Sequence, residues 1–179
     1  MLIVSDSALQ RAIDALSFND VYIARTEAWL ADGFEPQYSD TAQLDTSWKH
    51  VVTQSQVATL VSDEGEERLL FRVMIDLGMR LNEVKDQKPE KPDADDESSS
   101  SDNADLDEIY ACVEASFVAE YEMKGELDEE AMRTFSLNNA SYHVWPYWRE
   151  YLMSQCTRMN LPKVAVPARQ FAQNRSGNS

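Results

Sequence analysis

The sequence has few of the residues on which known catalytic and metal-binding motifs depend. Its 179 residues include two cysteines, two histidines and five glycines. The glycines are scattered, so there is no glycine-rich phosphate loop or nucleophile elbow, and no cysteine and histidine spacing fits a zinc site. His50 and His143 lie far apart in the chain, and each has a simple structural explanation, on a strand and on a helix. We therefore expect neither an enzyme nor a bound cofactor or metal.

Basic residues and long apolar runs are also scarce. Sixteen lysines and arginines stand against 32 acidic residues, and the net charge of -16 argues against nucleic acid or an anionic membrane as a partner. No run of about 18 apolar residues is present to cross a bilayer, and the first residues lack the pattern of a secretory signal. These absences predict a cytoplasmic protein without membrane insertion. Cys112 and Cys156 have no regular spacing, which favours free buried thiols over a disulfide or a metal pair.

The length predicts a single domain, 1–179, with one interruption. Residues 86–108 contain ten acidic residues and two lysines, a net charge of -8 that is half of the charge of the chain. Such a segment cannot bury enough apolar area to offset the entropy of ordering, so we predict a disordered acidic insertion. Residues 170–179 are predicted to form a flexible tail. The folded body is therefore less acidic than the whole chain.

Four segments have strand patterns: 18–30, 48–63, 69–81 and 109–124. The third alternates most strictly, with one apolar and one largely polar face. In the second, alternation predicts that Val51, Val57 and Val61 share one face and that Val52 lies on the other. A four-residue turn with a glycine, 63–66, predicts a hairpin between the second and third strands.

Helical patterns lie at both ends of this sheet. Residues 5–17 predict a short amphipathic helix, and 127–135 a short helical turn capped by Asp128. The longest pattern, 137–159, gathers apolar residues at steps of three and four from Leu137 onward, and Pro146 within it predicts a kink or a helix start. Residues 31–47 are predicted to be a loop. The fold class is therefore α+β, with the long helix packed on one face of the sheet.

Three stretches of the C-terminal half together resemble the export chaperone SecB. They are 117–122 (FVAEYE), 145–150 (WPYWRE) and 159–162 (MNLP), the last followed by Val164 and Val166. The resemblance covers about 109–167 in sequence, and 18–84 in architecture alone. It implies a four-stranded antiparallel Greek-key sheet and a homotetramer built as a dimer of dimers. It also implies an ATP-independent holdase, active in protein folding and transport, that binds unfolded polypeptides in apolar grooves without a cofactor.

The resemblance also assigns residues to roles. It implies a client-binding groove formed by Trp29, Phe34, Tyr38, Trp48, Val164 and Val166. It implies a role in the fold and in subunit packing for Trp145, Pro146, Tyr147, Trp148, Arg149 and Glu150. An alternative function, suggested by the alternation of the strands, is an adaptor that binds a folded partner through the polar sheet face around Arg72, Asp76, Arg80 and Glu120.

The chain departs from the SecB pattern in ways that bear on its partners. At most residues 168–173 correspond to the second helix of the family, and the acidic tail that engages the motor SecA is replaced by QNRSGNS. The N-terminal helix and the acidic insertion are additions. These features resemble the divergent SecB-like chaperones of toxin-antitoxin systems, in which the client is an antitoxin.

Overall fold

The computed structural model describes residues 7–83, 108–164 and 166. In chain order the elements are α1 (Ala8–Ala15), β1 (Leu16–Leu30), the short 3-10 helix η1 (Thr41–Gln43), β2 (Leu44–Val61), β3 (Glu67–Glu83), β4 (Ile109–Met123), α2 (Glu129–Asn138) and α3 (Ala140–Arg158). The predicted insertion at 86–108, except Glu108, and the predicted tail at 170–179 lie outside the described residues.

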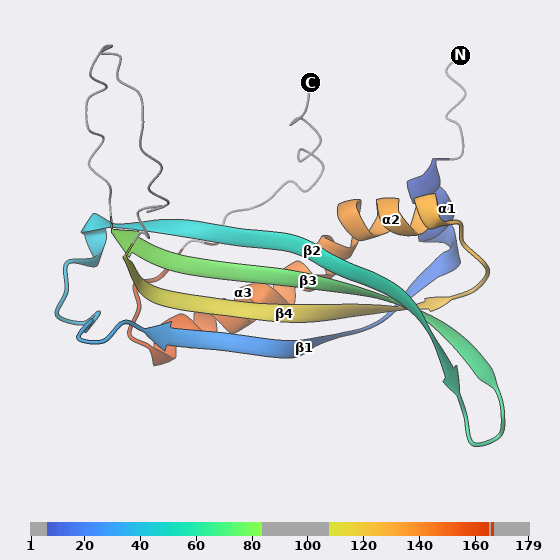
Figure 1. The fold of residues 1–179 in the computed structure, drawn as a ribbon, viewed down its shortest axis with the longest axis horizontal. Helices are drawn as coiled ribbons and strands as arrows, with labels where there is room; N and C mark the ends of the chain where they lie inside the picture. Colours follow the sequence, from blue (N-terminus) through green and yellow to red (C-terminus); the bar gives the residue numbers. More distant parts are fainter. Residues whose placement is uncertain (1–6, 84–107, 165, 167–179) are drawn as a thin grey trace, which may run out of the picture.

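The four strands form one antiparallel sheet in the order β1-β4-β3-β2. Strands β2, β3 and β4 are neighbours in chain order, whereas β1 crosses to the far side and pairs with β4, which is the Greek-key arrangement. Figure 1 shows that β1 and β2 are the two edges of the sheet. The predicted hairpin between the second and third strands and the predicted Greek-key sheet are therefore confirmed.

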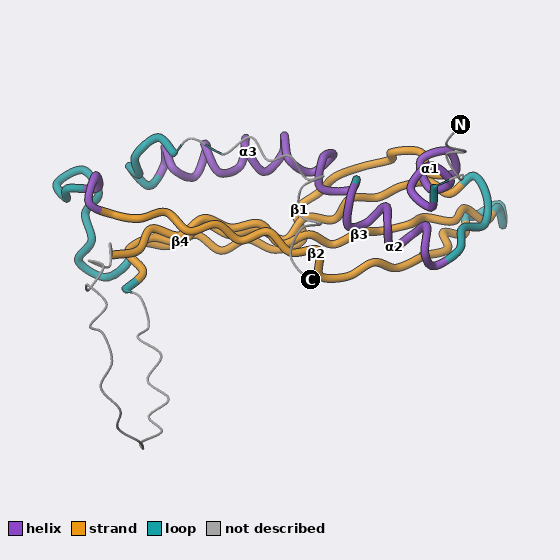
Figure 2. Tube along the Cα trace, turned by 90° about the horizontal axis from the view of Figure 1, so that it is seen from above, coloured by secondary structure: helices purple, strands orange, loops and turns teal. Residues whose placement is uncertain are grey.

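The helices cover one face of the sheet. Helix α3 runs along this face, and α1 and α2 gather at one end of the molecule (Figure 2). The central contact joins Trp148 of α3 to Phe117 of β4, whose rings meet edge to face with centroids 6.4 Å apart. Trp148 is 1% exposed, and Val144 and Leu152 are buried on the same side of the helix. The long helix thus forms the main core with β3 and β4, as predicted.

Both histidines tie the first turn of α3 to the sheet. His50 Nε2 of β2 lies 2.8 Å from the hydroxyl of Ser141, and His143 Nδ1 lies 2.8 Å from the hydroxyl of Tyr121 of β4. The structural explanations predicted for the two histidines are therefore confirmed. The two cysteines are free and buried, also as predicted. Burial raises the pKa of Cys112 to about 11, so its thiol stays protonated at neutral pH.

The predicted alternation of the second strand was wrong in its middle. The pairing of β2 with β3 shifts between Val52, opposite Ile75, and Gln54, opposite Met74. Thr53 is the extra residue of this β-bulge, and its hydroxyl donates to the carbonyl of Met74 at 3.3 Å. A bulge reverses the alternation beyond it. Val52 and Val57 consequently face the same side, while Val51 faces the other.

The predicted helix boundaries also need correction. Helix α2 continues to Asn138, and α3 begins at Ala140, so Leu137 belongs to α2 and is 50% exposed rather than buried. Asp128 caps α2 as predicted, by accepting from the backbone N–H of Ala131 at 2.8 Å. Pro146 lies inside α3, so the long helix does not start there.

Two other predicted boundaries differ by a few residues. Helix α1 is shorter than 5–17, because Ser7 caps it and the chain enters the sheet at Leu16. Strand β2 begins at Leu44 within the segment 31–47 that was predicted to be a loop. The first residues of β2 were predicted as a loop because several of them are polar. In the strand, side chains such as Asp45 and Ser47 point outward.

Candidate functional site

Four of the six predicted groove residues lie on the helix-covered side of the sheet. Phe34, Trp48, Val164 and Val166 are partly buried and pack against the hydrophobic core. The Phe34 ring lies 5.3 Å from the ring of Tyr110, and Trp48 pairs with the buried Met79. These side chains therefore supply apolar surface that the core only partly covers.

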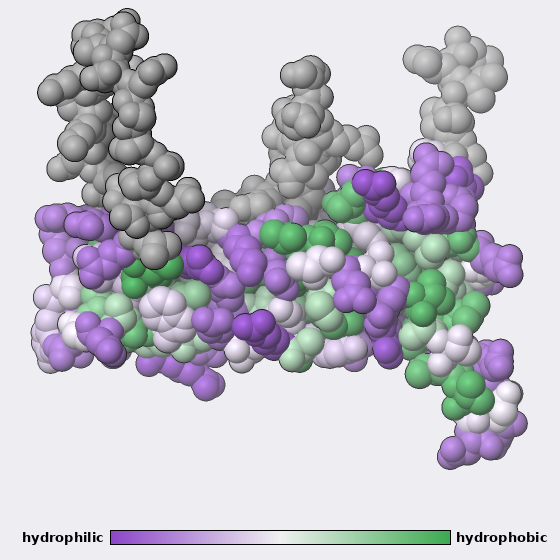
Figure 3. Space-filling view, viewed as in Figure 1, coloured by the Kyte–Doolittle hydropathy of each residue, from purple (hydrophilic) through white to green (hydrophobic). Residues whose placement is uncertain are grey.

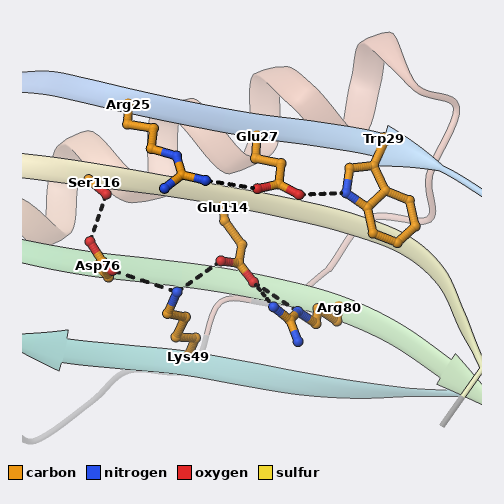
Figure 4. Close-up of polar contacts among 8 residues, drawn as sticks. All are labelled: Arg25, Glu27, Trp29, Lys49, Asp76, Arg80, Glu114 and Ser116. Atoms are coloured by element: carbon orange, nitrogen blue, oxygen red, sulfur yellow. Dashed lines mark hydrogen bonds and ion pairs between the residues drawn. The ribbon is translucent and has the colours of Figure 1, made fainter. Parts of the chain in front are cut away.

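The other two predicted groove residues lie elsewhere. Tyr38 is 82% exposed in the segment between β1 and η1. Trp29 pairs with Cys112 and lies on the polar face of the sheet, where its indole N–H donates to Glu27 at 2.9 Å (Figure 4). The structure of the single chain thus does not bring Trp29 together with Phe34 and Trp48.

An apolar hollow of about 180 Å³ lies between the end of α3 and the segment that follows it. Its lining residues are Leu152, Met153, Cys156, Thr157, Leu161, Lys163 and Val164. Burial raises the pKa of Cys156, so that this side chain contributes as a neutral, apolar group. Of these residues the sequence predicted only Val164. The four-residue spacing of Leu152 and Cys156, followed by Leu161, is the signal that could have indicated the hollow.

The opposite face of the sheet carries a network of ion pairs. Glu114 of β4 accepts from Lys49 at 3.0 Å and from Arg80 at 2.8 Å, as Figure 4 shows. Lys49 also lies 3.6 Å from Asp76, which accepts from the hydroxyl of Ser116 at 2.7 Å. Burial acts to raise the pKa of Glu114, but the hydrogen bonds from Lys49 and Arg80 outweigh it and the pKa is lowered.

Further along the same face, Arg72 donates to Glu120 at 2.7 Å, and Asn19 donates to the other carboxylate oxygen of Glu120 at 2.6 Å. The four residues considered for binding a folded partner, Arg72, Asp76, Arg80 and Glu120, are therefore all engaged within the chain. A hollow of about 190 Å³ on this face is lined by Tyr22, Ala24, Gln54, Gln56, Arg72, Met74 and Val118. Figure 3 shows the mixture of polar and apolar residues over this face.

The residues predicted to serve the fold and subunit packing divide into two groups. Trp148 is in the core and Trp145 packs partly against it. Pro146, Tyr147, Arg149 and Glu150 are exposed on the outer side of α3. The edge strand β1 likewise exposes Phe18, Tyr22 and Ile23. The single chain therefore leaves large apolar side chains uncovered on both α3 and β1.

Within residues 7–83, 108–164 and 166, no group of three or more histidine, cysteine or acidic side chains is placed to hold a metal ion. Among the helices that the structure describes, none is both long enough and apolar enough to cross a bilayer. The candidate site in the described part of the chain consists of the partly covered apolar side chains of the helix side and the hollow beside α3.

No protein-family model matches the sequence, and no curated protein matches it. The structure is similar to the SecB-like chaperone Rv1957 of Mycobacterium tuberculosis, in complex with a ChAD peptide from the HigA1 antitoxin Rv1956. The TM-score is 0.56 at 17% sequence identity, and the similarity covers 89% of this chain and 94% of that chain. Because the match spans almost all of both chains, it includes the sheet, its Greek-key connection and the helical layer. The chain therefore has the SecB-like fold that its sequence predicts.

Proposed function

We propose that this protein is an ATP-independent chaperone, a holdase that binds unfolded or aggregation-prone polypeptides on apolar surfaces. The observation that carries the proposal is the set of apolar side chains left partly uncovered on the helix side: Phe34, Trp48, Val164 and the hollow beside α3. The similarity to a chaperone in complex with an antitoxin peptide supports the same function, and an antitoxin is the client that we propose. The cytoplasm is the proposed compartment.

The binding mode follows from the kind of contact that these residues offer. Partly buried aromatic and aliphatic side chains bind other apolar groups without demanding one geometry, and each Å² of apolar area removed from water contributes about 25 cal/mol. An unfolded segment adds several such contacts along its length. Binding lowers the concentration of free unfolded client and so slows its aggregation.

Assembly is part of the proposal. We propose a homotetramer, a dimer of dimers, in which the exposed residues Tyr147, Arg149 and Glu150 of α3 contact another subunit. The uncovered apolar residues of β1 and the unpaired backbone of this edge strand support such a contact, since exposed strand edges pair readily. Engagement of the motor SecA is not part of the proposed function.

The test combines molar mass with an aggregation assay. Light scattering of the full chain is expected to give about four times the mass of one 20.4 kDa chain. A chemically unfolded client diluted into the protein without ATP is expected to stay soluble. Phe34→Ala with Trp48→Ala should abolish this protection while circular dichroism reports a folded protein. Protection that is unchanged in the double variant, or absent in the wild type, would overturn the proposal.

A further inference from the structure

The hairpin between β2 and β3 extends beyond the rest of the sheet. Strand β3 pairs with β4 from Leu70, which lies opposite Glu122, whereas β2 and β3 remain paired as far as Val61 and Glu67. Figure 1 shows the hairpin projecting past the ends of β1 and β4. We define residues 57–69 as the arm. Most of its length is a ribbon of only two strands.

The arm exposes large apolar side chains. Val57 is 46% exposed, Leu60 44%, Val61 63% and Leu69 37%. A two-stranded ribbon is at best marginally stable in water, and its stability increases when another surface covers its apolar residues. In Figure 3 apolar residues gather where this hairpin leaves the body. The composition of the arm is therefore that of an interaction surface.

The arm joins a groove at its base. A hollow of about 320 Å³ lies between the hairpin and α2, and it is lined by Ser55, Gln56, Val57, Phe71, Glu129, Met132 and Arg133. The register of β2 and β3 places Val57, Val61 and Leu69 on the same side of the ribbon as Phe71. Val57 belongs to both features, so the groove and this side of the arm are contiguous, and their apolar residues are Phe71, Met132, Val57, Val61 and Leu69.

The charge of the arm indicates what covers this surface. Four exposed carboxylates, those of Asp63, Glu64, Glu66 and Glu67, lie at its tip. The nearest basic residue, Arg68, pairs with Glu122 at 3.0 Å. Two arms placed tip to tip would bring like charges together in a chain with a net charge of -16, which disfavours a second arm as the occupant. A partner segment with lysine or arginine complements the tip.

We propose that the arm and its groove bind an extended apolar segment, rich in lysine or arginine, from another polypeptide. This surface is separate from the helix-side residues Phe34 and Trp48, and it rests on the proposed function only in that a client supplies the segment. Alternate apolar side chains of the segment cover Val57, Val61 and Leu69. The intervening basic side chains reach the carboxylates of the tip.

The test measures binding of a fluorescein-labelled peptide of alternating leucine and lysine to the full chain by anisotropy. Val61→Ser with Leu69→Ser is expected to weaken binding at least about tenfold, because two apolar contacts are lost. Val51→Ser is the matched control: Val51 lies on the same strand and is 46% exposed, but it faces the other side of the sheet and lies outside the arm. This control is expected to bind like the wild type.

A second variant leaves the apolar residues of the arm intact. Glu64→Lys with Glu66→Lys leaves these four tip positions with no net charge, so the preference for the leucine and lysine peptide over a leucine and glutamate peptide is expected to weaken. Equal binding to wild type and both arm variants would overturn the inference, as would a loss of oligomeric mass in the arm variants without peptide binding. Peptide binding at the arm in a protein without anti-aggregation activity would instead overturn the proposed function alone.

Discussion

Glu114 of β4 reaches Lys49 of β2 by crossing directly over Gly78 of β3. The three residues are paired in one row of the sheet, and the carboxylate lies 3.0 Å from Lys49 Nζ. A Cβ at position 78 would lie 2.8 Å from Glu114 Cγ and 3.2 Å from Lys49 Cβ. The absence of a side chain at Gly78 therefore makes room for the ion pair that links the edge strand to the centre of the sheet.

Gly78→Ala is expected to destabilise the protein by about 1–3 kcal/mol, because the added methyl group displaces the stem of Glu114. Chemical denaturation measures this change. Gly125→Ala is the control, since a Cβ there would meet nothing within 4 Å. A Gly78→Ala protein as stable as the wild type would contradict this account of the row.

The pH dependence of stability is expected to respond to Glu114→Gln. The folded protein holds the pKa of Glu114 below its ordinary value of 4.5, so the stabilisation is present above that value and is lost as the pH falls through the lowered pKa. Denaturation midpoints measured below pH 4.5 should consequently fall less steeply in the variant. Glu64→Gln, at the exposed tip of the hairpin, is the comparison. If the denaturation midpoints of Glu114→Gln and of the wild type fall equally steeply below pH 4.5, the prediction is refuted.

His143 contributes a second pH dependence at milder acidity. Burial lowers the pKa of this imidazole from 6.5, so the unfolded state binds the proton first as the pH falls. Stability is therefore expected to decrease from about pH 6.5 down to the lowered pKa. His143→Asn should remove this dependence while keeping an acceptor near Tyr121. The measurement is the denaturation midpoint at several pH values, and equal slopes for both proteins would exclude the mechanism.

Two adjacent residues of α3 should respond differently to truncation. Trp148→Ala removes a side chain that is 1% exposed and is expected to cost about 3–5 kcal/mol of stability, if the variant folds. Tyr147→Ala removes an exposed ring and should change the stability of the single chain little, but reduce the oligomeric mass. Thermal unfolding and light scattering distinguish the effects. A Tyr147→Ala protein with unchanged mass would place the subunit contact elsewhere.

The strands illustrate how far the sequence predicts this fold. Strict alternation over 69–81 correctly predicts β3, its buried Phe71 and Ile75, and the hairpin that precedes it. The bulge at Thr53 could not be predicted from the neighbouring sequence, because the residues around it alternate equally well in either register. Trp29 is a similar case, since the register shifts within β1 decide which face it occupies.

The sequence predicted that helices form this layer, but it did not predict where α2 ends and α3 begins. The apolar spacing of 137–159 correctly assigns Val144, Trp148 and Leu152 to the core. It cannot show that α2 ends at Asn138, because the side chains of two consecutive helices continue almost the same spacing. The hollow beside α3 was missed for a related reason. It depends on the path of residues 161–164 over the helix, which no local pattern specifies.

The bulge at Thr53 divides β2 into two parts that face different regions of the molecule. Before it, Trp48 and His50 face the helices; after it, Val57 faces the groove beside α2. Because Thr53 is the residue without a partner in β3, its deletion would restore regular pairing and leave Val57 opposite Phe71 and Val61 opposite Glu67. The same residues paired without a bulge, with Thr53 retained, would instead turn Val57 and Val61 to the face of Val51. In the evolution of such a protein, one codon at this position can therefore be gained or lost without exchanging the two faces of the arm.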